Sequence, residues 1–409
     1  MSDIKRTSTD RANESVSRTK NIGAILLESF KKDTMLYILV IVYIFFLILT
    51  KGGIFRSSSF TELVNQNTYV YIIGTGMLMC MLTGGNIDLS CGSFVCLLGA
   101  LGGIFMVLKG VSAGVSILLM LAIGIAYGTL LGWLIAYVHI PPWIATLAGY
   151  LAFRGLGTSI LQNNSATSSL SPIPVEFRDV FYGRIFPTKE GEMNWPCFIA
   201  GIVAAAVIVT VILVNRKNRV KKGYEVESIG KTYVKCGIGC AVILLLMTKL
   251  ALGGGIPTSL LWVVGIVLTY NFITSRTTIG RHFYVVGGNI EAARLSGVNT
   301  RRIMFIAYLN MAVLTSIATM TVISRSQSAN SFIGNNFEMD AISACVVGGV
   351  SASGGSGTVL DMVIGATLIG IINLGMSLIS LDANYQSVVK GFVLLAAVVF
   401  DILSHKRKK

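Results

Sequence analysis

Long apolar stretches alternate with short polar ones along most of this chain. We read candidate helical spans at 35–50, 68–83, 93–109, 111–138, 143–162, 196–214, 236–252, 256–274, 302–323, 338–350, 357–380 and 386–403. Most reach the roughly 17–25 residues that cross the hydrocarbon core of a bilayer, whereas 338–350 is short and indicates a broken or re-entrant helix. The pattern predicts an all-α polytopic membrane protein with about 10–12 transmembrane helices.

Composition agrees with this class. Hydrophobic residues make up 53% of the chain and charged residues 13%, with a mean hydropathy of +0.73, whereas soluble proteins carry about 25% charged residues. No long stretch is polar enough for a separate soluble domain. We expect a cytoplasmic N-terminal tail at 1–34, one transmembrane domain at 35–403 and a basic cytoplasmic tail at 404–409.

The charges suggest an orientation. The net charge is +14, and 23 of the 33 Lys and Arg fall in the tails and in the loops 215–235 and 275–302. Membrane proteins concentrate Lys and Arg in cytoplasmic loops, and an even number of crossings puts both termini on one side. We therefore expect both termini in the cytoplasm, and we expect no nucleic-acid partner because no recognition motif accompanies the charges.

Residues for chemistry are scarce. The sequence has no phosphate-binding loop of the GxxxxGK[ST] type, its three histidines lie far apart, and its seven cysteines fall in or beside apolar runs. We interpret the cysteines as small buried residues and expect no catalytic or metal site. Among ionisable residues inside spans, Asp361 and Lys390 are predicted to pair as a structural tie, with a proton relay as the alternative. Arg154 either lines a polar path or anchors a helix end by reaching outer water.

The polar stretch 275–303 interrupts the apolar pattern. Gly287 and Gly288 are expected to break the chain, Asn289 to cap a short helix "IEAARLSG", and Gly297 to end it. One interpretation is a helix that docks on a cytoplasmic partner. The other is an ordinary basic cytoplasmic loop.

Several separate blocks resemble one transporter family. The stretch "EAARLSGVNTRRI" is similar to the EAA loop of ABC importer permeases, and "GGNIDLSCGSFVCLLGAL", "PPWIATLAGYLAFRGL" and the stretch from 335 to 403 resemble the permeases for ribose, xylose and galactose. The blocks occur in the same order over about 60–170 and 254–403. The extra length resembles the longer xylose and multiple-sugar permeases and corresponds to a helix pair inserted at 196–252.

The resemblance implies an ABC importer permease fold similar to the vitamin B12 permease, and a pathway for a monosaccharide such as xylose, galactose or glucose. It implies a homodimer or a heterodimer with a paralogue in a bacterial plasma membrane, two cytoplasmic ATPase subunits that hold ATP and Mg²⁺, and an extracytoplasmic sugar-binding protein. The coupling helix would carry Asn289, Glu291, Ala292, Ala293, Arg294 and Gly297.

Polarity and position suggest residues for the substrate pathway, namely Asn86, Asp88, Ser90, Arg154, Asn310 and Asp340. Three alternatives remain at this stage. The chain could belong to a permease of the same family for an autoinducer-type sugar or a nucleoside, to an ion-coupled secondary transporter, or to a membrane-embedded enzyme or scaffold. The scarcity of buried carboxylates argues against ion coupling.

Overall fold

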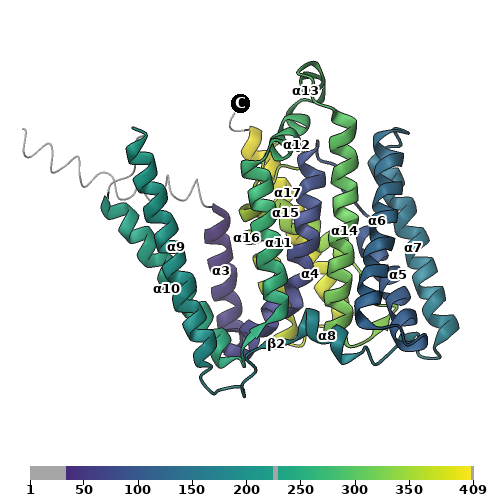
Figure 1. Ribbon diagram of the computed structural model, residues 1–409, viewed down its shortest axis with the longest axis horizontal. Coiled ribbons are helices and arrows are strands. Elements are labelled where there is room, and N and C mark those ends of the chain that lie inside the picture. Colours follow the sequence, from purple (N-terminus) through teal and green to yellow (C-terminus); the bar gives the residue numbers. More distant parts are fainter. Residues whose placement is uncertain (1–33, 224–228, 407–409) are drawn as a thin grey trace, which may run out of the picture.

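The computed structural model describes residues 34–223 and 229–406 as a set of helices that stand roughly side by side (Figure 1). The expected tails at 1–33 and 407–409 lie outside the described residues. The helices before the middle of the chain are α3 (Thr34–Leu49), α4 (Ser57–Leu82), α5 (Cys91–Gly103), α6 (Ala113–Ala136), α7 (Pro142–Asn164), α8 (Val175–Tyr182) and α9 (Trp195–Lys221). Those that follow are α10 (Ile229–Leu252), α11 (Thr258–Arg276), α12 (Thr278–Gly288), α13 (Ile290–Leu295), α14 (Thr300–Ser326), α15 (Phe337–Gly348), α16 (Val359–Leu378) and α17 (Ala383–Lys406).

Four two-residue strands and two short helical turns complete the described chain. Strand β1 (Ser169–Leu170) pairs antiparallel with β4 (Ala329–Asn330), and β2 (Arg184–Ile185) with β3 (Ile256–Pro257). The turns are η1 (Gly53–Phe55) and a π-helical turn η2 (Ile104–Leu108) that continues α5.

The expected fold class is confirmed. Within the described residues, seven helices are long and apolar enough to cross a membrane, namely α5 with its π turn, α6, α7, α9, α11, α14 and α16. The largest boundary error concerns α4, which begins at Ser57 and not near 68. Its first three turns are polar, so hydropathy missed them, although Asn65 and Asn67 are buried.

Helix α14 lies in the middle of the bundle and packs on α4 and α6 (Figure 1). Its contact with α6 depends on Gly124, Gly128 and Gly132, which follow one another at intervals of four. A Cβ at Gly128 would lie 2.8 Å from Ala312 Cβ and 2.9 Å from Leu309 Cα. Small residues at this spacing let two backbones approach closely, so these glycines serve the packing of α6 on α14.

The two ends of α14 define two sides of the molecule. Helix α13 lies beyond the Thr300 end, and α8 with the β1–β4 pair lies at the Ser326 end (Figure 1). We call these the α13 side and the α8 side. The stretch predicted as a short span runs between them. Helix α15 has only 12 residues, or about 18 Å, and the loop 327–336 covers the remaining path from the α8 side.

Helices α9 and α10 pack mainly on each other, and Figure 1 shows them at the edge of the bundle beyond α3. They join the body through a small cluster that includes Cys197, Leu250 and Ile256. Lys249, near the end of α10, donates to the Phe55 carbonyl at 2.8 Å and lies 3.5 Å from the centre of its ring. The origin of this pair as an insertion stays a prediction.

Candidate functional site

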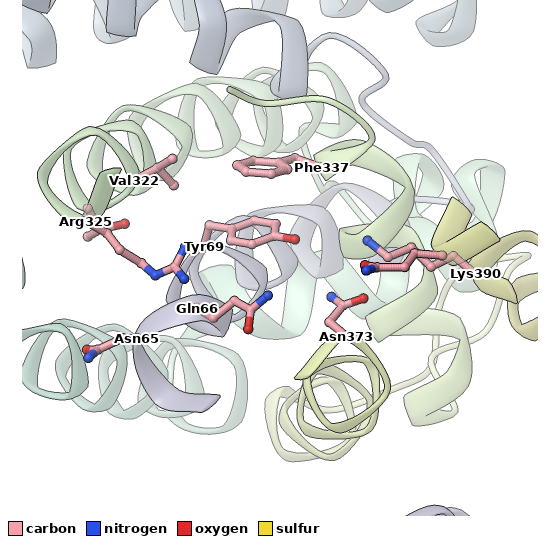
Figure 2. Close-up of a pocket in the computed structure, with 10 residues that line it drawn as sticks. Asn65, Gln66, Tyr69, Val322, Arg325, Phe337, Asn373 and Lys390 are labelled. Carbon is pink, nitrogen blue, oxygen red and sulfur yellow. The ribbon is translucent and has the colours of Figure 1, made fainter. Parts of the chain in front are cut away.

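A polar cavity of about 190 Å³ opens between α4, α14, α15, α16 and α17. Its volume is below the roughly 300–1,000 Å³ of sites for drug-sized ligands, so it suits a small solute. Figure 2 shows the Tyr69 and Phe337 rings one above the other, with Arg325 at one end and Lys390 at the other. The lining residues are Asn65, Gln66, Tyr69, Thr321, Val322, Arg325, Phe337, Asn373, Gln386 and Lys390.

One wall of the cavity combines an aromatic pair with a buried ion pair. The Tyr69 and Phe337 ring centroids lie 3.7 Å apart with planes 16° from parallel. Tyr69 Oη donates to Asp340 Oδ2 at 2.5 Å, and Lys390 Nζ donates to the same oxygen at 3.0 Å. Asp340 is only 2% exposed. Because α15 starts only at Phe337, inside the bundle, it presents this ring and the Asp340 carboxylate one turn apart at the same wall.

The opposite walls carry amides. Asn65 Oδ1 accepts from Ser259 Oγ at 2.6 Å, and the Gln66 and Asn373 amides also line the cavity (Figure 2). Asn373 is 5% exposed, and its Oδ1 has no hydrogen-bond partner among the described residues. A buried polar atom without a partner costs free energy, so this oxygen is available to a hydroxyl donor of a solute.

The predicted pairing of Asp361 with Lys390 is wrong. Asp361 Oδ2 accepts from the Thr358 backbone N–H at 2.9 Å and from Thr358 Oγ1 at 2.8 Å. The Thr358 hydroxyl in turn accepts from the Asp361 N–H at 3.1 Å. This reciprocal cap satisfies donors at the start of α16, and Lys390 instead pairs with Asp340.

Of the residues predicted for the pathway, Asp340 does not line this cavity itself but bonds two residues that do, Tyr69 and Lys390. Asn86 lines a second, more open cavity of about 520 Å³ on the α13 side, and its Nδ2 donates to the Thr83 carbonyl at 3.0 Å. That Asn86 and Asp340 contact the substrate stays a prediction.

The other four predicted pathway residues line neither cavity. Asp88 Oδ1 accepts from the Ser90 N–H at 2.8 Å, and Ser90 Oγ bonds both that carboxylate and Tyr127 Oη. Asp88 and Ser90 are fully buried in this network. Tyr270 Oη donates to Asn310 Oδ1. These contacts give the Asp88 carboxylate, the Ser90 hydroxyl and Asn310 Oδ1 internal partners, while Asn310 Nδ2 is buried without a partner among the described residues.

Arg154 bonds backbone carbonyls of its own chain, and its two expected roles stay predictions. Its Nη1 donates to the carbonyls of Ser331 at 3.3 Å and Ile333 at 3.0 Å. Both carbonyls belong to the loop between β4 and α15. The guanidinium therefore holds the backbone of the segment that leads into the half-length helix α15.

None of the residues that line the smaller cavity was predicted for the pathway, and those on α4 show why. The run "NQNTYVY" at 65–71 places three carboxamides and two phenols in one stretch. The span was predicted to begin at 68, so the three carboxamides fell in the loop before it and the two tyrosines inside the span. Extending the predicted helix toward the N-terminus, through this polar run, would have placed these residues inside the bundle and marked them as candidates.

The short helix α13 forms as the sequence predicts. Asn289 is the N-cap, and its Oδ1 accepts from the Ala292 N–H at 2.9 Å. Gly297 follows the helix with φ of +82°. Ala293 is fully buried, while Glu291 and Arg294 are exposed and Leu295 is 88% exposed. The expectation that Gly287 and Gly288 break the chain is wrong, because both lie in the last turn of α12 and the break falls at Asn289.

The cysteines show no shared site. All seven are free thiols, six of them buried. Within 34–223 and 229–406, no group of three His, Cys, Asp or Glu side chains lies close enough to hold a metal ion.

Comparison with known proteins assigns the class. The family described as branched-chain amino acid transport system / permease component matches residues 59–398. The xylose transport system permease of Haemophilus influenzae is 33% identical over 378 residues, which cover 91% of this chain and 96% of the relative. The ribose import permease of Escherichia coli is 30% identical over 349 residues, 85% of this chain and 86% of the relative. No solved structure matches.

A multi-pass helical bundle with a small polar cavity fits a membrane transport subunit, and the family match identifies the chain as one. The chain belongs to the branched-chain amino acid transport system / permease component family. It is therefore a permease component of a transport system and not an enzyme, and the resemblance to ribose- and xylose-type permeases is confirmed.

Proposed function

We propose that this chain is the permease subunit of an ATP-driven importer that carries a monosaccharide, with a pentose as the favoured substrate, across a bacterial plasma membrane. The observation that carries the proposal is the cavity of about 190 Å³ with its stacked aromatic wall and its amides. The relatives named for xylose and ribose transport support the same substrate class.

The cavity has the chemistry that a sugar needs. A sugar ring offers a weakly polar C–H face, which packs on an aromatic surface, and hydroxyl groups, which bond amides and charged groups. Phe337 and Tyr69 supply the aromatic surface, while Asn373, Gln66 and Arg325 supply donors and acceptors. Sites of this kind combine an apolar wall with a few placed polar groups.

The energy source is assigned to a partner. Helix α13 presents Glu291, Arg294 and Leu295 to solvent on the α13 side, and a helix of six residues is too short to be stable by itself in water. In the proposal it docks on a cytoplasmic ATPase that binds ATP and Mg²⁺. A sugar-binding protein then docks on the α8 side, and two permease chains form the complete pathway.

Reconstitution tests this function. Vesicles that contain the permease, the ATPase and the binding protein are expected to accumulate a radiolabelled pentose only with ATP. Vesicles that contain this chain alone are expected to accumulate none, with or without an ion gradient. Accumulation by the chain alone, driven by a gradient and abolished by an ionophore, would show a secondary transporter instead.

Asn373→Leu separates a solute contact from a structural role. The substitution removes a buried oxygen that has no partner at nearly constant volume, so the melting temperature is expected to stay the same or rise. Loss of one hydrogen bond to a sugar, about 1–1.5 kcal/mol, is expected to lower uptake by roughly tenfold. Pentose uptake at limiting concentration is the measurement.

The matched control is Asn163→Leu on the exposed end of α7, which is expected to transport normally. Normal uptake by Asn373→Leu would remove this residue from the pathway.

A further inference from the structure

Three segments meet backbone to backbone on the α13 side. A Cβ at Gly287, in the last turn of α12, would lie 1.8 Å from the Leu82 carbonyl oxygen at the end of α4 and 2.6 Å from the Gly355 nitrogen. The Gly355 N–H itself donates to the Leu82 carbonyl at 3.3 Å. Gly287 therefore sits where only a residue without a side chain fits, between α4 and the loop 349–358.

Neighbouring glycines extend this contact. A Cβ at Gly85 would lie 2.2 Å from the Ala352 carbonyl oxygen, and one at Gly354 would lie 2.5 Å from Gly84 Cα. Gly85 and Gly354 also have φ of +75° and +87°, which other residues rarely adopt. We call Gly84, Gly85, Gly287, Gly354 and Gly355 the glycine junction.

One side-chain bond reinforces the glycine junction. Tyr284, one turn before Gly287 on α12, donates from Oη to the Gly357 carbonyl at 2.9 Å. Burial raises the pKa of the Tyr284 phenol, so the group stays protonated and remains a donor at neutral pH. Helix α12 therefore contacts the loop 349–358 at two positions one turn apart, Tyr284 and Gly287.

The junction leads from α13 to the cavity through continuous helices. From Leu82, α4 runs back to Tyr69, about 20 Å along the helix axis. From the loop 349–358, α16 runs to Asn373, and α15 lies on the loop's other side with Phe337 at its far end. Rigid elements of this kind carry a displacement between sites, because packed interfaces take discrete arrangements.

We propose that the glycine junction is the mechanical link by which displacement of α13 reaches the cavity, and that Gly287 is its central positioning residue. This inference rests on the proposed function, in which an ATPase moves α13. The atoms around Gly287 belong to backbone, so a methyl group there can be accommodated only if α12 moves away from α4.

The adjacent glycine offers a matched control. A Cβ at Gly288 would meet no atom within 4 Å among the described residues, and its φ lies outside the left-handed region. Gly287→Ala and Gly288→Ala therefore add the same methyl group to the same helix turn, one residue apart, with opposite steric results.

The test uses the complete complex in lipid nanodiscs. For each variant, the ATPase rate with pentose-loaded binding protein is divided by the rate without it, and pentose uptake is measured in vesicles. We expect Gly287→Ala to lower the ratio toward one and uptake by about tenfold or more, while the ATPase still co-purifies at the wild-type ratio. Gly288→Ala is expected to match the wild type. A wild-type ratio and wild-type uptake for Gly287→Ala would overturn the inference and leave the proposed function intact.

A second variant covers the case in which Gly287→Ala does not assemble. Tyr284→Phe removes only the donor to Gly357 and is expected to lower the stimulation ratio about two- to fivefold, with a decrease in melting temperature no larger than the loss of one hydrogen bond causes. An unchanged ratio would overturn the inference. If the wild-type complex itself shows neither stimulation nor uptake with any monosaccharide, the proposed function fails and the inference fails with it.

Discussion

Replacing Asp340 with alanine is expected to lower the free energy of unfolding by about 3 kcal/mol and to abolish sugar transport. The carboxylate is 2% exposed and accepts from both Tyr69 and Lys390. Its removal leaves a phenol and an ammonium group without their acceptor, and breaking one half of a buried pair costs about 3–5 kcal/mol. The lower end applies because the Lys390 side chain is 22% exposed and can still reach water in the cavity.

The measurement is thermal unfolding in detergent together with pentose uptake. Asp179→Ala is the matched control, because Asp179 also pairs with a cation, Arg178, at 2.9 Å but is 54% exposed. Exposed pairs contribute about 0–1 kcal/mol, so this variant is expected to melt close to the wild type. A stability loss for Asp340→Ala no larger than that of Asp179→Ala would show that the buried pair contributes little.

A double substitution separates the cost of the stranded charge from the value of the pair. Asp340→Ala combined with Lys390→Met removes both charges and keeps the long side chain at 390. It is expected to recover most of the lost stability, because no buried ammonium remains without a partner. Transport is expected to stay low, since the cavity has lost the Lys390 ammonium group and Tyr69 has lost its acceptor. Equal destabilisation of the single and double variants would place the main contribution in the Tyr69–Asp340 bond instead.

Local features of the structure could be predicted from the sequence. The cap at Asn289 and the left-handed Gly297 depend only on the few residues between them, and both appear where the sequence places them. The long apolar helices follow from hydropathy for the same reason. Prediction failed for α4, because burial of its polar first turns depends on partners such as Ser259, which lies 194 residues away.

The cavity could not be predicted, because its walls are long-range contacts. Tyr69 and Asp340 are separated by 271 residues, and no local pattern indicates their approach. Polarity inside a span selected Asp88 and Arg154, but polarity does not distinguish a residue that lines a path from one that has internal partners. Asp88 bonds Ser90 two residues away, and Arg154 holds the loop before α15.

Two glycine-rich stretches of the sequence contact each other in the structure, which their sequences alone do not show. The stretches "GGNIDLSCGS" at 84–93 and "GGVSASGGSG" at 348–357 each hold a glycine pair followed by Ser and Gly. In the structure they touch, since Gly85 abuts Ala352 and Gly354 abuts Gly84. Two loops that pack this closely each need glycines, so the similarity of the two stretches has a steric cause.

Glu291→Lys is expected to abolish ATP-dependent sugar uptake while the protein still folds and inserts. Glu291 is exposed in the first turn of α13 and is the only carboxylate between 275 and 303, a stretch that also holds five arginines. Inside the chain the substitution loses only a helix-dipole contribution of about 0.3–1 kcal/mol. Across an interface with an ATPase, reversing a charge costs several kcal/mol, so uptake is expected to fall at least about tenfold.

The control for this variant is Glu176→Lys, which makes the same reversal at an exposed position in the first turn of α8, on the opposite side of the molecule. Retention of the ATPase on tagged permease is the readout: Glu291→Lys is expected to lose it, and Glu176→Lys to keep it.

The experiment also decides between the two interpretations of the basic stretch. A cytoplasmic loop that only sets orientation becomes more positive in Glu291→Lys, which strengthens its topological signal, so uptake would stay normal. A docking helix loses its complementary contact. Normal uptake and normal ATPase retention in Glu291→Lys would therefore favour the simple loop. The Glu291 side chain is exposed and has no ion pair among the described residues, so the sign of its charge matters at a partner surface.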